Sequence, residues 1–240
     1  MQVVILAGGL GTRLGSLTRD TPKPMVPVAG VPYLEHQLRI IGEQGIRRIV
    51  LLTGYLGEQI EEYFGTGKRL GLDIRYSRET TPLGTGGALR LAAPLLDDEF
   101  LLLYGDSYLP IQYADVLGSL RRSSIGATVI YDNTQADTMV LNNIAIDDEG
   151  RVTRYRKDGN EGELRYVEAG VHALRKSVLR YFPANPVVSL ENDIFPKLIE
   201  DGRLHCHITD QRFYDIGTPE RLKVIEELFH HDHHQNTVPR

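Results

Sequence analysis

Residues 2–30, QVVILAGGLGTRLGSLTRDTPKPMVPVAG, contain the features that decide the fold of this chain. The short apolar run at residues 3–6 predicts a buried strand, which leads directly into a loop with Gly8, Gly9 and Gly11. Glycines there let backbone N–H groups converge on one point, and such a concavity binds phosphate oxygens. The loop carries one acid, Asp20, against three cations, so the sequence predicts a polyphosphate site. Those cations are Arg13, Arg19 and Lys23.

Two familiar phosphate motifs are excluded by spacing. After Gly9 and Gly11, the fingerprint G-x-G-x-x-G requires a glycine where this chain has Leu14, and Gly15 comes one residue late. The P-loop pattern also fails, because no glycine is followed by Lys and Ser or Thr at the required spacing. The sequence therefore supports neither a Rossmann dehydrogenase nor a P-loop kinase.

The composition is that of a globular α/β protein. The chain has 240 residues, 41% hydrophobic and 25% charged, with a net charge of −5. That charge gives no reason to expect a nucleic-acid partner. No apolar run approaches the ~18 residues of a membrane span, and the N-terminus does not resemble a signal peptide. With Cys206 as the single cysteine, we expect a cytoplasmic protein without membrane association.

Strand and helix patterns alternate along the first half of the chain. The strands are nearly continuous apolar runs, which suit a sheet covered on both faces. The order predicts a Rossmann-like, doubly wound, mostly parallel sheet, with ligands at the carboxyl ends of the strands. The expected strands are 3–6, 48–53, 73–78, 99–104 and 127–131, and the expected helices are 33–43, 56–64, one from about 88, and 113–122.

The pattern changes near residue 138. We expect a hairpin, then further strands and helices that form a small β-rich lid. No Pro-, Gly- or Ser-rich linker separates the halves, so we expect one domain over 1–240, with parts at about 1–137 and about 138–217 and a closing helix and tail at 218–240. The expected elements are strands 139–146, 151–157, 166–174, 205–209 and 213–214, and helices 176–181, 190–200 and 218–230.

The run LAGGLGTRL at residues 6–14, followed by Pro22-Lys23-Pro24, resembles the signature of the sugar-1-phosphate nucleotidylyltransferases. The resemblance continues to about Leu222. It implies the nucleotide-diphospho-sugar transferase fold and in-line attack of a sugar phosphate, the acceptor, on a nucleoside triphosphate. It also implies that about 1–137 binds the nucleotide and that the lid at about 138–217 carries the acceptor site. It also implies Mg²⁺ as cofactor, because carboxylates and substrate phosphates together hold that ion.

The resemblance assigns roles to individual residues. Asp106, after a buried strand, and Asp215, before the last helix, are the implied metal ligands and act in catalysis with Arg13 and Lys23. Asp106 could otherwise cap a turn, and the second glycine loop could be a simple turn and N-cap. The implied nucleotide-binding residues are Leu6, Ala7, Gly8, Gly9, Gly11, Thr12, Arg13, Lys23, Gly84, Thr85 and Gly86.

The acceptor site departs from the family pattern. Many relatives carry Glu-Lys-Pro where this chain has Arg156-Lys157-Asp158, and Glu168 stands where Asn is frequent. The implied sugar-phosphate residues are Tyr108, Asn142, Asn143, Lys157, Glu168 and Gly170.

Glu79 is a candidate reader of the base. Guanine presents two adjacent N–H donors that one carboxylate can accept, whereas uracil would turn carbonyl oxygens towards it. Glu79 precedes the second glycine loop, so we expect GTP to be preferred over UTP. The alternative is that Glu79 is a solvated strand end and that backbone groups read the base.

Within the family the chain looks most like the D-glycero-alpha-D-manno-heptose 1-phosphate guanylyltransferases. Mannose-1-phosphate guanylyltransferase, N-acetylmuramate-1-phosphate uridylyltransferase and an alcohol-phosphate cytidylyltransferase remain as alternatives. A regulatory subunit that binds nucleotide sugars without catalysis is expected to lack one of the four catalytic residues, and all four are present. The sequence leaves open the sugar, the base, assembly into a homo-oligomer and any role of the His-rich tail.

Overall fold

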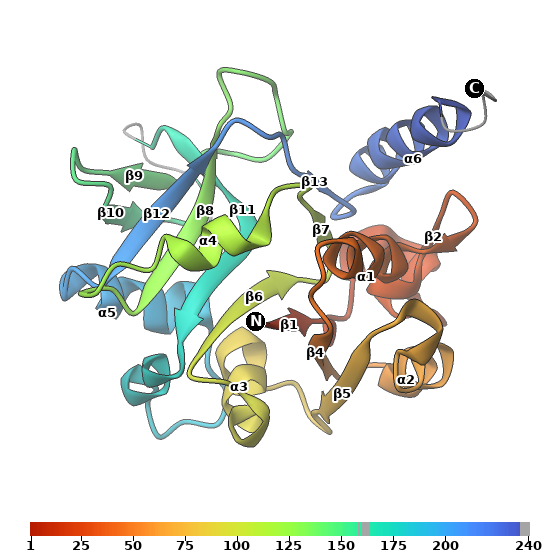
Figure 1. Ribbon diagram of the computed structural model, residues 1–240, viewed down its shortest axis with the longest axis horizontal. Coiled ribbons are helices and arrows are strands. Elements are labelled where there is room, and N and C mark those ends of the chain that lie inside the picture. Colours follow the sequence, from red (N-terminus) through yellow and green to blue (C-terminus); the bar gives the residue numbers. More distant parts are fainter. Residues whose placement is uncertain (158, 160–163, 236–240) are drawn as a thin grey trace.

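A computed structural model describes residues 1–157, 159 and 164–235, with side chains up to His230 (Figure 1). Its centre is a nine-stranded sheet in the order β10-β9-β11-β6-β1-β4-β5, to which β8 is joined through β11 and β12 through β8. The strands are β1 (Gln2–Leu6), β4 (Arg48–Thr53), β5 (Asp73–Arg78), β6 (Glu99–Tyr104), β8 (Gly126–Asp132), β9 (Ile144–Ile146), β10 (Val152–Tyr155), β11 (Tyr166–Arg175) and β12 (Leu204–Thr209).

The first half forms the parallel part of the sheet. β1 lies between β4 and β6 and is parallel to both, with Val3 opposite Ile49 on one side and Leu101 on the other. Along β1, Val3 and Ile5 belong to one apolar core while Val4 belongs to the other. Both faces of the strand are therefore covered, which explains its unbroken apolar sequence.

Helices cover both faces. The core on one face includes residues of α1 (Tyr33–Glu43), α2 (Gly57–Phe64) and α4 (Tyr113–Gly118). The core on the other includes residues of α3 (Gly84–Leu91) and α5 (Phe195–Glu200). The α/β, mostly parallel sheet with flanking helices confirms the predicted fold class.

The strands of the second half extend the same sheet and do not pack over its face as a separate lid. β11 is antiparallel to β6 and β8, and β12 is parallel to β8. The β9–β10 hairpin is antiparallel, as predicted, but β9 begins at Ile144 and not at residue 139. The Asn133 amide donates to the Val140 carbonyl, so this segment bonds to the preceding loop and not to a strand.

Two helices differ from their predicted limits. α3 begins at Gly84, before the expected Ala88, because the Val188 carbonyl accepts the N–H groups of Gly86 and Gly87 at 2.8 and 3.1 Å. α4 ends at Gly118, where the Ser119 hydroxyl donates to the Val116 carbonyl at 2.6 Å. The predicted helix 190–200 consists of a π turn, η6 (Leu190–Ile194), followed by α5.

The last helix, α6 (Pro219–Gln235), packs against the short hairpin of β2 (Pro27–Val28) and β3 (Val31–Pro32). Its Phe229 ring stacks on His36 with centroids 4.0 Å apart. The helix continues past the predicted end at His230, and the side chains of the His-rich tail beyond that residue lie outside the described part. No helix in the described part is both long and apolar enough to span a membrane.

Candidate functional site

The first glycine loop follows β1 directly and folds back against Lys23. Gly11 has φ of 63°, and a Cβ atom there would lie 2.9 Å from the Lys23 Cβ. The Thr18 hydroxyl, at the end of the 3₁₀ segment η1 (Thr12–Thr18), donates to the Gly11 carbonyl at 2.9 Å. Leu6, Ala7 and Gly8 thus lie at the carboxyl end of the central strand, while Gly9, Thr12 and Arg13 are exposed. The loop has the position that the sequence predicts.

Lys23 forms an ion pair with Asp106, which comes two residues after β6. The lysine is 8% exposed although it carries a charge. Burial alone would raise the pKa of Asp106, but the Lys23 ammonium, with Arg13 farther away, holds that pKa below its ordinary value. The structure therefore joins a cation and a carboxylate that are 83 residues apart.

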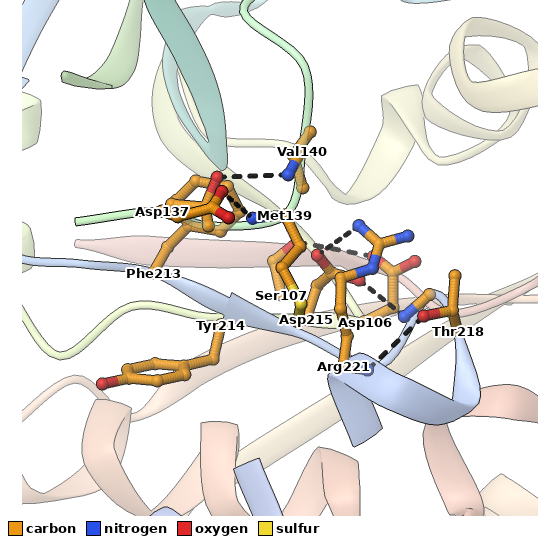
Figure 2. A network of polar contacts seen from close by, with 12 residues as sticks. Asp106, Ser107, Asp137, Met139, Val140, Phe213, Tyr214, Asp215, Thr218 and Arg221 are labelled. Carbon is orange, nitrogen blue, oxygen red and sulfur yellow. Dashed lines mark hydrogen bonds and ion pairs between the residues drawn. The ribbon is translucent and has the colours of Figure 1, made fainter. Parts of the chain in front are cut away.

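Asp215 reaches the same place through a two-residue strand pair. β13 (Tyr214–Asp215) is antiparallel to β7 (Ser107–Tyr108), which sets Asp215 opposite Ser107. Figure 2 shows Asp106, Ser107 and Asp215 together with Arg221. Burial raises the pKa of Asp215, Arg221 opposes this, and the negative charge of Asp106 adds to the increase.

The two aspartates fit a magnesium ion that is shared with a substrate. Among the described residues, no group of three or more His, Cys, Asp or Glu side chains is arranged to hold a metal. Mg²⁺ is commonly held by one or two carboxylates together with substrate phosphates, so it does not require a complete protein cage. Asp106 and Asp215 supply that number of carboxylates beside a phosphate-type loop.

The second glycine loop is tied to the segment 186–191. Gly84 has φ of 74°, and a Cβ there would lie 2.5 Å from the Val188 carbonyl oxygen. The Thr85 hydroxyl donates to Glu191 and accepts the Leu190 N–H, each at 2.8 Å. The Thr85 hydroxyl and the Gly86 N–H are therefore occupied within the protein, which the sequence could not indicate.

Glu79 lies between the two glycine loops. One carboxylate oxygen accepts the Leu83 N–H at 3.0 Å. A Cβ on Gly8 or Gly54 would come within 3.4 or 2.9 Å of the other oxygen, so the carboxylate lies over the backbone of both. Burial raises the pKa of Glu79 above its ordinary value. The side chain is half-buried and held, and it is not a freely solvated strand end.

Three of the six predicted acceptor residues, Asn143, Glu168 and Gly170, gather on the other side of β6. The Asn143 side-chain oxygen accepts the Glu168 N–H at 2.9 Å, and the Glu168 carboxylate accepts the Gly170 N–H. Gly170 has φ of 77°, and a Cβ there would lie 2.4 Å from the Ser107 hydroxyl oxygen, so β11 passes directly behind the residue that follows Asp106.

The remaining three acceptor candidates lie elsewhere or bond differently. Asn142 accepts a hydrogen bond from the Asn133 amide at 3.0 Å. Lys157 forms an ion pair with Glu191, with 3.7 Å between Nζ and Oε2. Asp158, the next residue of the predicted segment, lies outside the described residues. The Tyr108 ring packs edge-on against Phe229 of α6, 5.0 Å between centroids, so its side chain belongs with the closing helix and not with Glu168.

Glu191 and Arg221 are site residues that the sequence reading missed. Glu191 is 4% exposed and accepts hydrogen bonds from Thr85, from Tyr104 at 2.6 Å and from Ser189 at 2.6 Å. Burial would raise the pKa of Glu191, but the Lys157 ammonium and the Ser189 and Tyr104 hydroxyls hold that pKa below its ordinary value. The segment Leu190–Ile194 reads LENDI, and no local pattern separates buried Glu191 from its exposed neighbour Asp193. Arg221 had no signal either, because a charged residue in the first turn of a helix is ordinary.

Known proteins are similar to this chain over most of its length. The sequence model of the family described as nucleotidyl transferase matches residues 2–230. The mannose-1-phosphate guanylyltransferase of Mycobacterium tuberculosis is 33% identical over 92% of this chain but only 62% of that protein. The D-glycero-alpha-D-manno-heptose 1-phosphate guanylyltransferase of Campylobacter jejuni is 32% identical over 92% of this chain and 96% of that protein. A UTP–glucose-1-phosphate uridylyltransferase of Synechocystis is 29% identical, so the relatives differ in base and sugar.

Solved structures give the same picture. The crystal structure of HddC from Yersinia pseudotuberculosis has a TM-score of 0.82 and 30% identity, covering 95% of this chain and 99% of that one. The structure of that protein complexed with GMP-PN has a TM-score of 0.80. A putative glucose-1-phosphate thymidylyltransferase from Bacillus anthracis reaches 0.81 at 21% identity, which supports the fold alone.

Proposed function

Since the chain belongs to the nucleotidyl transferase family, we propose that it transfers a nucleotidyl group from a nucleoside triphosphate to a sugar 1-phosphate. The observation that carries this proposal is the meeting of Lys23, Asp106 and Asp215 beside the first glycine loop. The donor side is residues 1–137 and the acceptor side residues 138–217, with 218–240 as closing helix and tail. We take 1–240 as one domain and expect it in the cytoplasm, where nucleoside triphosphates are available.

In the proposed reaction a phosphate oxygen of the sugar 1-phosphate attacks the α-phosphorus of the nucleotide. A new P–O bond forms as the bond to the β-phosphate breaks, and pyrophosphate leaves with the electron pair. Arg13, on the exposed face of the loop, binds the leaving pyrophosphate, and buried Lys23 binds the oxygens near the α-phosphorus. Asp106 and Asp215 would hold Mg²⁺, which neutralises charge that develops on the phosphates.

We favour GTP as the donor. The position of Glu79 over Gly8 and Gly54 supports this, because a fixed carboxylate next to the loop can accept both donors of a guanine edge. The names of the heptose and mannose relatives point in the same direction, whereas the Synechocystis relative uses UTP. Gly84 and Thr85 then shape the wall of the nucleoside site.

For the acceptor we favour D-glycero-alpha-D-manno-heptose 1-phosphate, with mannose 1-phosphate as the alternative. Two buried carboxylates, Glu168 and Glu191, lie on the acceptor side, with side chains 8% and 3% exposed. Among the described residues, Lys157 lies 3.7 Å from Glu191, and the His172 ring lies 3.3 Å from Glu168. A neutral, hydroxyl-rich sugar suits this environment, whereas the carboxylate of N-acetylmuramate would meet like charge.

The test is a pyrophosphate-release screen of GTP, UTP, dTTP and CTP against a panel of sugar 1-phosphates, with phosphocholine added. We expect the highest kcat/KM with GTP and a neutral manno-configured sugar, and little turnover with N-acetylmuramate 1-phosphate. Glu79→Gln should reduce the preference for GTP over UTP by about 1–3 kcal/mol, the value of a hydrogen bond to a charged group. Preference of the unmodified protein for UTP contradicts the guanylyltransferase assignment. If no combination of nucleotide and sugar 1-phosphate releases pyrophosphate, the result favours the alternative of a non-catalytic regulatory subunit.

A further inference from the structure

Each of the two candidate metal ligands already has a cation of its own. Asp106 is paired with Lys23, and Asp215 is paired with Arg221 at 2.8 Å between Oδ2 and Nη1. The second oxygen of Asp215 accepts the Gly217 N–H at 2.5 Å. Figure 2 shows the arginine directed at Asp215 from the start of α6. The side chains of Arg221 and Asp215 are 13% and 11% exposed, so solvent screens the pair only weakly.

The backbone leaves space for this pair. A Cβ at Gly217 would lie 2.6 Å from the Arg221 Nη2 and 2.6 Å from the Asp215 Oδ1. Arg221 also stands in the first turn of α6, where the helix dipole disfavours a positive charge. The helix itself therefore does not explain the arginine, but its contact with Asp215 does.

We propose that Arg221 is a positioning residue which, together with Lys23, keeps the Asp106–Asp215 pair electrically balanced until nucleotide binds. The inference rests on the proposed function, because it takes these aspartates as the metal ligands. Two carboxylates and two cations sum to zero, with Arg13 nearby as a further positive charge. A divalent ion alone then gains little from this site, and it must compete with two ion pairs.

A nucleoside triphosphate changes the balance. Its phosphates offer Lys23 and Arg13 a stronger anionic partner, which frees Asp106 to hold the ion that arrives with the nucleotide. Metal and nucleotide therefore increase one another's affinity, as linkage requires for any such pair. Arg221 stays on Asp215 and keeps the carboxylate in place, because Gly217 and the cap of α6 fix both partners.

The probe is Mn²⁺ alone, with the free ion measured by electron paramagnetic resonance and no nucleotide present. Arg221→Gln should bind Mn²⁺ roughly tenfold more tightly than the unmodified protein, because a positive charge near the ion is removed. A gain in affinity is not what structural damage produces. Lys23→Gln should give a gain of similar size, and Arg221→Lys, which keeps the charge, should give little change.

Arg212→Gln is the matched control. Arg212 lies in the same segment but donates to the Asp137 carbonyl and covers the Tyr214 ring at 4.4 Å. Its loss removes the same charge from the protein and should leave Mn²⁺ affinity within about threefold of the unmodified protein, because that charge is more exposed and better screened.

Two failures are distinguishable. If both Arg221→Gln and Lys23→Gln bind Mn²⁺ as tightly as the unmodified protein or more weakly, this inference is overturned. The proposed function still holds in that case if the unmodified protein releases pyrophosphate. If the double variant Arg221→Gln, Asp106→Asn binds Mn²⁺ as tightly as Arg221→Gln alone, Asp106 is not a metal ligand, and the inference falls with that assignment.

Discussion

At the scale of the residue, two neighbouring glycines differ in what constrains them. A Cβ on Gly8 would lie 3.2 Å from the Gly54 nitrogen, so the protein itself favours glycine there. A Cβ on Gly9 would meet nothing within 4 Å, and Gly9 has no positive φ. The fold gives no steric reason for Gly9, and a ligand that approaches the backbone closely gives one.

Gly9→Ala is accordingly expected to leave Tm within about 2 °C, because the methyl group enters open space. We expect KM for the nucleotide to rise about tenfold or more, since the methyl group occupies the space of a phosphate oxygen. Thermal unfolding and steady-state kinetics check both parts. A normal KM would show that the ligand does not approach Gly9.

Asp106→Asn keeps the shape of the side chain but removes its charge. Lys23 then loses its ion-pair partner, and the proposed magnesium site loses one of its two carboxylates. We expect kcat to fall by roughly 100-fold or more, the range for loss of an electrostatic element of the transition state. Turnover within a few-fold of the unmodified protein would contradict the assignment of Asp106.

At the scale of the element, β11 brings the proposed acceptor side against Asp106, through Gly170 and Ser107. Its register with β8 shifts between Glu168 and His172, and Gly170 lies in that bulge with φ of 77°. The bulge brings the Glu168 Oε1 to 3.3 Å from the His172 Nε2, although residues four apart in a regular strand are well separated.

Gly170→Ala is predicted to disturb this element. The added methyl would lie 2.4 Å from the Ser107 hydroxyl oxygen, and the backbone would be strained at positive φ. We expect a loss of about 1–3 kcal/mol in the free energy of unfolding and a larger relative loss of kcat, because Ser107 adjoins Asp106. The control is Gly118→Ala, whose Cβ meets nothing within 4 Å. Equal effects of the two substitutions in urea unfolding and kinetics would refute the role of the bulge.

The elements also show what the sequence could predict. The helix at 33–43 and the strands at 48–53, 73–78 and 99–104 have their predicted limits, because local apolar periodicity determines them. The predicted start of α3 was wrong, because the first turn of this helix donates hydrogen bonds to the Val188 carbonyl, about a hundred residues away. The approach of Asp215 to Asp106 depends on a strand pair of only two residues, which no local pattern reveals. The surroundings of Tyr108 and Glu191 could not be predicted either, because both side chains contact residues that are distant in the sequence.

At the scale of the whole molecule, one buried acid joins three elements outside the site. The Glu35 side chain of α1 is 1% exposed and accepts hydrogen bonds from Arg39 at 2.5 Å, from Tyr63 of α2 at 2.9 Å and from Arg69 of η3 (Lys68–Leu70) at 2.7 Å. Burial would raise the pKa of Glu35, but the Arg69, Tyr63 and Arg39 hydrogen bonds lower it from 4.5 to about 2.

Stability should therefore depend on pH through Glu35. A depressed pKa stabilises the folded state above the ordinary value near 4.5, and this contribution is lost as pH falls towards 2. Both arginines are about half exposed, so we expect the contribution to be about 1–3 kcal/mol at neutral pH. Urea unfolding should show Glu35→Gln less stable at pH 7, with a gap that narrows towards pH 3. A gap that is independent of pH would contradict this origin.

The shared position of Glu191 has a consequence for how such a protein can evolve. One carboxylate oxygen accepts hydrogen bonds from the Thr85 and Ser189 hydroxyls and lies near Lys157. It therefore contacts both the proposed nucleoside loop and the proposed acceptor side. Substitutions at Thr85 and Lys157 should therefore be epistatic. We expect a double-mutant cycle on kcat/KM to show coupling of about 0.5 kcal/mol or more, and additive effects would argue against it. A substitution that changes the sugar specificity of such a protein should then also change its nucleotide preference, because Glu191 contacts residues on both sides of the site.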